Sequence, residues 1–262
     1  MNHTTDLLNS AAATTLVLFA FRLGGLVLIA PVFSAKTVPM KLRVVLIVLF
    51  TWLLAPAVVI PGAAPALTFG TAATETLVGF AIGFGAAVFV GAIEAAGDLI
   101  SISSGLSGAE LLDPLTGIQS GALAQFANFF AIAVLLAVNA HILMLRALTT
   151  SVELIPVGSA VDVQPGLARL VSLGSTLFLL GLRFAAPVLA VVLLGNVALA
   201  ILARVAPQVN ALSVAFPLQI GISLFALATA VPIIGAFYAG WQGSYESVVM
   251  NLLGAFAGAG AR

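Results

Sequence analysis

Residues 171–203 read VSLGSTLFLLGLRFAAPVLAVVLLGNVALAILA, an apolar run with a single charged residue, Arg183, and a proline, Pro187. As an α-helix this run would be about 50 Å long, whereas the hydrocarbon core of a bilayer is only about 30 Å thick. Continuous apolar runs of this length are typical of membrane helices, so the run predicts an all-α membrane protein. Because proline removes a backbone donor, we expect the helix to be kinked or broken at Pro187.

The whole chain has the composition of an integral membrane protein. Its 262 residues are 62% hydrophobic and 7% charged, with a mean hydropathy of +1.24, whereas soluble domains are about 45–50% apolar and about 25% charged. The apolar residues run continuously, which favours spanning helices over the alternating strands of a barrel. Pro217 and Pro232 again predict kinked or broken helical hairpins. We predict six apolar segments: 11–33, 44–60, 67–93, 122–148, 171–203 and 211–240.

The ends of the chain and its first basic loop bear on orientation. The first ten residues contain Asp6 and no basic residue, so we expect the first apolar run to remain attached rather than act as a cleaved signal peptide. Lys36, Lys41 and Arg43 lie between the first two segments, which predicts a cytoplasmic loop. We expect one membrane domain over residues 1–262, with flexible or peripheral ends at 1–10 and 241–262.

Glycines in the third segment indicate close helix packing. Gly79 and Gly83 form a GxxxG pair, and we expect Gly85 and Gly91 to continue the same thin helix face. Small residues let helix backbones approach closely where water cannot drive association. The neighbour is either another helix of this chain or another subunit.

Two arginines lie inside predicted spans. Arg22 falls within the first segment and Arg183 within the fifth. A central arginine costs about 2.5–3.5 kcal/mol on insertion scales unless it is paired or faces water. We expect intramembrane charge pairing with a carboxylate, or use at a subunit contact, in preference to a position in a pore. The candidate carboxylates are Glu75, Glu94 and Asp98.

The residues contain no recognisable catalytic constellation. The chain has no cysteine and only two histidines, and it shows neither a metal-binding nor a phosphate-binding motif. We therefore expect no enzyme activity, no cofactor, no metal and no nucleic-acid partner. A proton-coupled transporter is the alternative, with Glu75 as its one candidate relay inside a span. A Glu75→Gln change is expected to abolish transport in a transporter and to be tolerated in a channel subunit.

Residues 101–121, SISSGLSGAELLDPLTGIQSG, are the polar exception in this apolar chain. One interpretation is a solvated connector between helices. The other is a displaceable loop, because its glycines leave the backbone free, Asp113–Pro114 restricts it locally, and its leucines can seal a narrow passage. The leucines are Leu106, Leu111, Leu112 and Leu115, and the glycines include Gly105, Gly108 and Gly117.

Four stretches resemble one known family, in order along residues 20–240. They are RLGGLVLIAPVFSAKTVPMKLRV (22–44), GLSGAELLDPLTG (105–117), NAHILMLRALTTSVELIPVG (139–158) with its Ser and Pro-x-Gly, and ARVAPQVNALSVAFPLQIG (203–221). The family is that of the flagellar biosynthesis protein FliR. Its signature residues match Arg204, Pro207, Gln208, Asn210 and Pro217. The injectisome branch, SctT, tends to have Lys-Ser after the second proline, where this chain has Gln219, so the flagellar branch is preferred.

The resemblance implies a subunit of the flagellar type III export gate in the bacterial inner membrane. In this family the subunit joins FliP and FliQ copies in a helical, pore-forming hetero-oligomer, with FlhB, through which unfolded flagellar proteins pass. The loop near 105–119, with Gly105 to Gly117, is then expected to plug the closed pore. The signature turn is expected to make subunit contacts, with Gln208 and Asn210 bonded to backbone groups around Pro207. A virulence secretion subunit and a stand-alone ion or solute transporter remain the alternatives.

Overall fold

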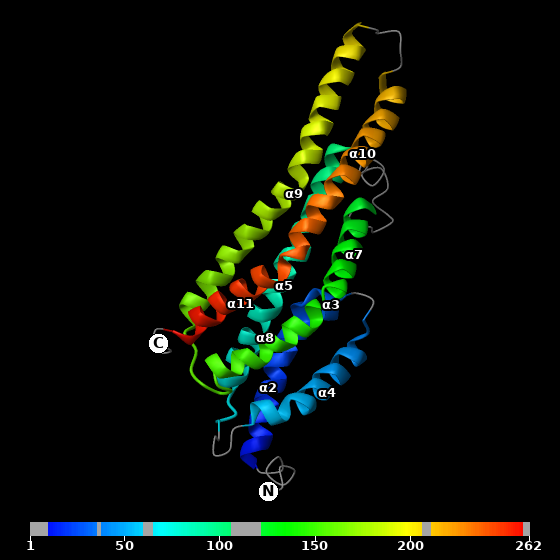
Figure 1. Ribbon diagram of the computed structural model, residues 1–262. Helices are drawn as coiled ribbons and strands as arrows, with labels where there is room; N and C mark the ends of the chain where they lie inside the picture. The colour runs from blue at the N-terminus through cyan, green and yellow to red at the C-terminus, as the bar shows by residue number, and fades with distance from the viewer. Residues whose placement is uncertain (1–9, 36–37, 60–64, 106–121, 206–210, 259–262) are drawn as a thin grey trace. The chain divides into compact units, whose positions relative to one another are not determined.

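The computed structural model describes residues 10–35, 38–59, 65–105, 122–205 and 211–258. Within these ranges the regular elements are all helices, and no described residue is in a strand, as Figure 1 shows. The all-α fold predicted from the apolar runs is therefore confirmed. The helices are α2 (Ser10–Ile29), α3 (Pro31–Ser34), α4 (Met40–Val58), α5 (Phe69–Ser103), α7 (Ala122–Ala137), α8 (Ala140–Leu154), α9 (Val163–Val205), α10 (Ala211–Ala239) and α11 (Trp241–Ala257).

Several helices have the length and apolar character of membrane spans. In the described part of the chain four helices qualify: α4, α5, α9 and, within α2, the range Ala11–Ile29. The bent pair of α7 and α8 makes a fifth span if the two helices are counted together. Within α10, Pro217–Ala226 is a shorter apolar helix. Each of the six predicted apolar segments thus lies on one helix or on two consecutive helices.

The prolines do not end the helices that contain them. α9 continues through Pro187, and α10 continues through Pro217 and Pro232. A proline in a membrane helix removes one backbone hydrogen bond, and the remaining bonds can keep the helix continuous. Of the two expectations at Pro187, a kink or a break, the break is therefore absent.

The observed break lies instead inside the predicted segment 122–148. α7 ends at Ala137 and α8 begins at Ala140, with Asn139 between them in the left-handed conformation (φ 57°, ψ 33°). Asparagine tolerates this conformation better than most residues. The carbonyl of Asn139 accepts hydrogen bonds from the amides of Ile142 and Leu143, so a new helix starts there. The sequence predicts an apolar segment at 122–148 but no break within it, because the break depends on the left-handed conformation of Asn139.

Two other predicted boundaries also change. α5 runs to Ser103, ten residues past the predicted end at residue 93. At the C-terminus, residues 241–257 form α11, which buries Trp241, Tyr245, Val249, Leu252, Leu253 and Phe256. Of the two expectations for this end, flexible or peripheral, the flexible one does not hold for residues 241–257. An apolar residue recurs there every three or four positions and gives the helix a face to bury.

The chain divides into two compact units. The first comprises residues 1–88, 135–174 and 241–262. In it α2 packs on α4, and α11 packs on α8. Its core includes Phe19, Ile82 and Trp241, and the Tyr245 hydroxyl donates to the Ile82 carbonyl at 3.2 Å. This unit therefore has a core formed by helices far apart in the sequence.

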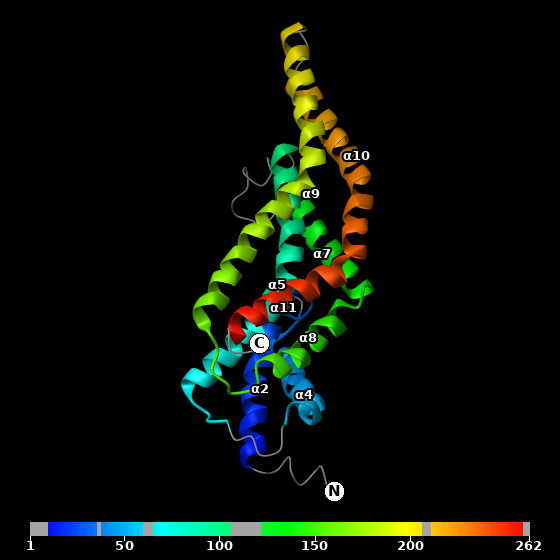
Figure 2. The ribbon, with the colours of Figure 1, turned by 60° about the vertical axis from the view of Figure 1, so that its left-hand side comes forward.

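The second unit comprises residues 89–134 and 175–240. Its part of α9 runs antiparallel to α10, and the two lie side by side in Figures 1 and 2. Gly181 of α9 lies against Ala92 and Ala95 of α5, and Gly195 lies near Ile222 of α10. Small residues thus allow the close approach of helices in this unit.

Candidate functional site

Arg22 and Glu75 form a buried ion pair in the first unit. The Arg22 Nε donates to Glu75 Oε2 at 2.6 Å, and Nη2 donates to Oε1 at 3.1 Å. Arg22 is 0% exposed and Glu75 is 2% exposed. Two parallel hydrogen bonds between a guanidinium and a carboxylate are the strongest geometry available to such a pair. Glu75 is one of the three carboxylates considered as partners in the sequence analysis.

Further hydrogen bonds extend this pair to two other segments. Arg22 Nη1 donates to Ser151 Oγ at 2.9 Å, and Nη2 also donates to the Ile155 carbonyl at 3.0 Å. The amide of Gly158 donates to Glu75 Oε1 at 2.8 Å. The polar cluster (Arg22, Glu75, Ser151, Ile155 and Gly158) therefore joins α2, α5, α8 and the connection after α8.

The cluster unites residues from separate sequence motifs. Arg22 opens the first motif, while Ser151 and Gly158 belong to the Ser and Pro-x-Gly of the third. Gly158 has φ +80°, a conformation that glycine adopts without strain. Residue types and spacing predicted no role for Ser151, Ile155 or Gly158. Their position within a family motif was the only indication of a role. Ile155 and Gly158 act through backbone groups, which nearly every residue type carries, so their identity could not predict these hydrogen bonds.

Glycines bring α5 close enough to α2 for the pair to form. A Cβ added at Gly79 would overlap the Arg22 carbonyl, and one added at Gly25 would overlap the Thr76 carbonyl. Gly83 likewise faces Leu26 and Ile29. The GxxxG pair Gly79 and Gly83 therefore packs α5 against α2.

The other two glycines of the predicted face do not belong to it. Gly85 lies near Tyr245 and Val249 of α11, and Gly91 lies near Leu177 of α9. Gly85 follows Gly83 by two residues, which is about 200° around a helix. The expectation of one continuous glycine face was therefore wrong, and the glycines serve several neighbours.

The geometry also bears on the transporter alternative. Both oxygens of Glu75 accept hydrogen bonds, from Arg22 and from Gly158. A proton relay needs a carboxylate that can exchange protons with water. Glu75 is buried and serves as the counter-ion of Arg22, which is a structural role.

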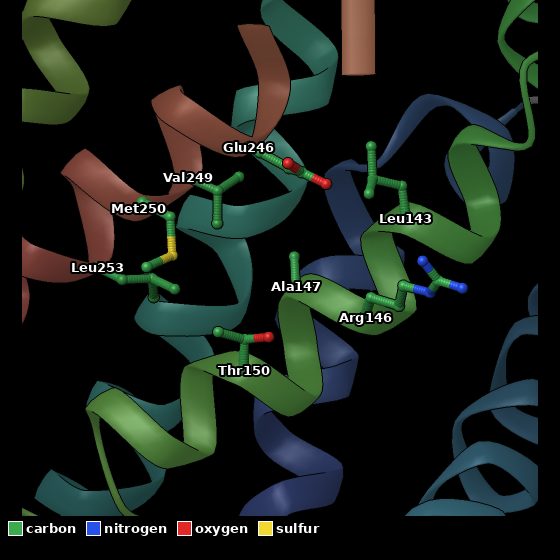
Figure 3. Close-up of a pocket in the computed structure, with 8 residues that line it drawn as sticks. All are labelled: Leu143, Arg146, Ala147, Thr150, Glu246, Val249, Met250 and Leu253. Atoms are coloured by element: carbon green, nitrogen blue, oxygen red, sulfur yellow. The ribbon is translucent and has the colours of Figure 1, made fainter. Parts of the chain in front are cut away.

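An open groove lies between α8 and α11 in the same unit. It has a volume of about 370 Å³, and Figure 3 shows Arg146 on the α8 side and Glu246 on the α11 side. Its other lining residues are Leu143, Ala147, Thr150, Val249, Met250 and Leu253. The groove combines a mostly apolar lining with one charge of each sign.

In the second unit, the end of α5 is held by α10. The Gln219 Nε2 donates to the Ser103 carbonyl at 2.8 Å, and Asn128 of α7 donates to Glu94 Oε2 at 2.8 Å. Gly105 follows with φ +70°. The polar stretch thus starts from an anchored helix end. The other predicted plug residues, Leu106, Gly108, Leu111, Leu112, Asp113, Pro114, Leu115 and Gly117, lie outside the described residues.

The predicted signature residues are only partly described. Arg204 is exposed in the last turn of α9, and Pro217 is exposed within α10. Pro207, Gln208 and Asn210 lie outside the described residues. Arg183 is exposed on α9, and among the described residues it has no ion-pair partner. The structure therefore brings Arg22 and Glu75 together in the first unit, whereas Arg183 belongs to the second unit.

Comparison with known proteins places the chain in a family. The profile of the family described as "Bacterial export proteins, family 1" matches residues 13–242. The flagellar biosynthetic protein FliR of Escherichia coli is 29% identical over 82% of this chain and 84% of its own length. The FliR protein of Pectobacterium carotovorum is 30% identical over 82% of this chain and 84% of its own length.

A relative from another system matches over a shorter range. The surface presentation of antigens protein SpaR of Shigella flexneri is 27% identical over 58% of this chain and 58% of its own length. The flagellar relatives therefore share more of the chain. Together with the helices long and apolar enough to cross a membrane, these matches identify the chain as a membrane protein of bacterial export family 1, the family of the flagellar biosynthetic protein FliR.

Proposed function

We propose that this chain is a non-enzymatic subunit of the flagellar type III protein export gate in the bacterial inner membrane. With FliP and FliQ, and closed with the help of FlhB, it forms a channel for unfolded flagellar proteins. The matches to FliR proteins over most of the chain support this assignment. The shorter match to SpaR makes a virulence secretion subunit the second candidate.

The observation that carries the proposal is the length and exposure of α9. With 43 residues it is about 64 Å long, and only 17% of its most apolar window is buried within the chain. To fit the 50 Å apolar run of residues 171–203 into a core of about 30 Å, α9 would need a tilt of about 53°, whereas spans tilt by about 0–40°. We expect neighbouring subunits to cover the part of the apolar run that the bilayer core does not.

A subunit interface also explains the exposed side chains of α9. Phe178 is 74% exposed, and Leu193 and Leu194 are 66% and 69% exposed. Contiguous exposed apolar surface marks a contact with protein or membrane. Since the bilayer is too thin to cover the whole run, other helices must cover part of it.

The polar stretch after α5 is the proposed plug of the closed pore. Gly105, the first residue of the proposed plug, follows a helix end that Gln219 holds in place. An anchored helix end followed by a glycine-rich stretch suits a segment that must leave and re-enter a channel. Passage of an export substrate would displace the stretch while α5 stays fixed.

Purification in mild detergent tests the function. The tagged full-length chain, co-expressed with FliP and FliQ from the same bacterium, should elute as one complex with several copies of both. A stable monomer, with neither protein bound, would refute the export-gate assignment. The matched control is the same tag on an unrelated membrane protein of similar size, which should recover neither.

The same preparation separates the second candidate. Expression in a strain that lacks flagellar FliR should restore motility if the chain is the flagellar subunit. Restoration of injectisome secretion without motility would assign it to the virulence branch instead.

A further inference from the structure

We propose that Arg183 forms an intersubunit ion pair with a carboxylate on an apolar helix of a neighbouring gate subunit. The inference rests on the proposed function and adds the chemistry of one contact. Arg183 is exposed near the middle of α9, the most extended apolar helix of the chain. A charge in that position needs a partner or water.

The surroundings of Arg183 define the contact surface. Gly181, Phe184, Ala185, Val188 and Val192 are buried, and they mark the side of α9 that packs within the second unit. Arg183 follows Gly181 by two residues and therefore lies about 200° around the helix, on the opposite side. We call Leu179, Arg183, Ala186, Ala190 and Leu194 the Arg183 face, and all five are exposed.

The composition of the Arg183 face argues against a water-filled channel wall. Leu179 is 52% exposed and Leu194 is 69% exposed, and both lie on the same side as Arg183. A wall facing water would expose these large apolar side chains at a cost of about 25 cal/mol per Å². The face instead suits an apolar partner that carries one compensating charge.

Lipid is a poorer occupant than protein for the same face. Apolar residues continue for about 18 Å on one side of Arg183 and about 30 Å on the other, within the run 171–203. Ala186 and Ala190 are four residues apart and exposed, a small-xxx-small pair that lets a second helix backbone come close. A helix packed there can carry its carboxylate to Arg183.

The carboxylate is best supplied by a different protein. In the four uninterrupted spans the described carboxylates all lie on α5. Glu75 is committed to Arg22 and Gly158, Glu94 accepts from Asn128, and Asp98 also has an interaction partner. A second copy of this chain that offered one of these α5 carboxylates to Arg183 would have to break the interaction that the carboxylate already makes. The charge of Arg183 therefore selects a partner helix with an Asp or Glu inside its apolar segment.

The test is co-purification of the full-length chain with its co-expressed gate subunits. R183M, which keeps an unbranched side chain but removes the charge, should recover roughly one-tenth or less of the wild-type amount of partner subunits, since truncating one side of a buried charge pair is costly. R183K should recover an intermediate amount. The matched control, R169M, changes an exposed arginine nearer the start of α9 and should recover the wild-type amount.

The partner residue is found by replacing each Asp or Glu in the partners' apolar segments with Asn or Gln. One such variant should reproduce the loss seen with R183M, and combining the two should add no further loss. Wild-type recovery by R183M, whether or not conductance changes, would overturn the proposal in favour of lipid or water around Arg183. If the wild-type chain recovers no partner, the proposed function fails, which is a separate result. Monodisperse elution of R183M excludes misfolding as the cause.

Discussion

Gln219 of α10 donates a hydrogen bond to the Ser103 carbonyl at 2.8 Å, across 116 residues of sequence. Ser103 ends α5, and the carbonyls of a last helical turn have no partner inside the helix. The side chain from the signature stretch therefore caps the helix that leads into the polar stretch.

Removal of this cap should loosen the end of α5. Gln219→Ala deletes one hydrogen bond, worth about 0.5–1.5 kcal/mol, so amide exchange at residues 100–105 should accelerate roughly 2- to 12-fold. Hydrogen exchange with mass spectrometry measures this. Gln242→Ala, at an exposed site on α11, is the control and should leave these amides unchanged. Equal protection in Gln219→Ala and the wild type would show that the bond does not hold α5.

Deletion of residues 108–113 tests the plug. The six-residue deletion should leave assembly with FliP and FliQ intact while the closed channel conducts ions, because the leucine-rich seal is shortened. Conductance of the purified complex in planar bilayers measures the effect, and the complex with the intact loop is the control. If the complex with the deletion conducts no more ions than the intact complex, the stretch is a connector and not a plug.

Removing one partner of the buried ion pair should strongly destabilise the first unit. Arg22→Met leaves Glu75 buried without its counter-ion, which should cost about 3–5 kcal/mol of unfolding free energy. Glu75→Gln should also destabilise the protein, because Arg22 then lacks an anion. The expectation that a channel subunit tolerates Glu75→Gln is therefore revised.

Thermal unfolding in detergent measures these costs. The double variant Arg22→Met/Glu75→Leu should recover part of the loss, since no charge remains buried. Glu153→Gln, at an exposed site on α8, is the control. Wild-type stability in Arg22→Met would mean that the pair contributes nothing.

Two glycine-to-alanine substitutions should change the unfolding free energy in opposite directions. Gly79→Ala places a Cβ against the Arg22 carbonyl, and overpacking of this kind costs about 1–3 kcal/mol. At Gly174, a Cβ would meet no atom within 4 Å, so Gly174→Ala should gain up to about 1 kcal/mol from helix propensity. Thermal unfolding of the two variants decides the matter, and equal shifts would contradict the packing of α5 on α2.

The sequence by itself determined the class of fold and the family. Apolar runs on this scale can satisfy their backbone groups in a membrane only as helices or barrels, and continuous rather than alternating apolar residues select helices. Four motifs in order carried the family resemblance, which the family match over residues 13–242 confirms. It also singled out Arg22 and Glu75 as charges that require explanation, because a charge is costly wherever it lies in a membrane.

Only the tertiary structure decided which groups meet. Three carboxylates were equal candidates for Arg22, and the selection of Glu75 depends on the contact between α2 and α5 that Gly79 and Gly25 allow. The break at Asn139 and the continuity through Pro187 likewise depend on backbone conformation that residue type does not dictate. Periodicity and charge act along one chain segment, whereas pairing and close packing depend on distances between segments far apart in sequence.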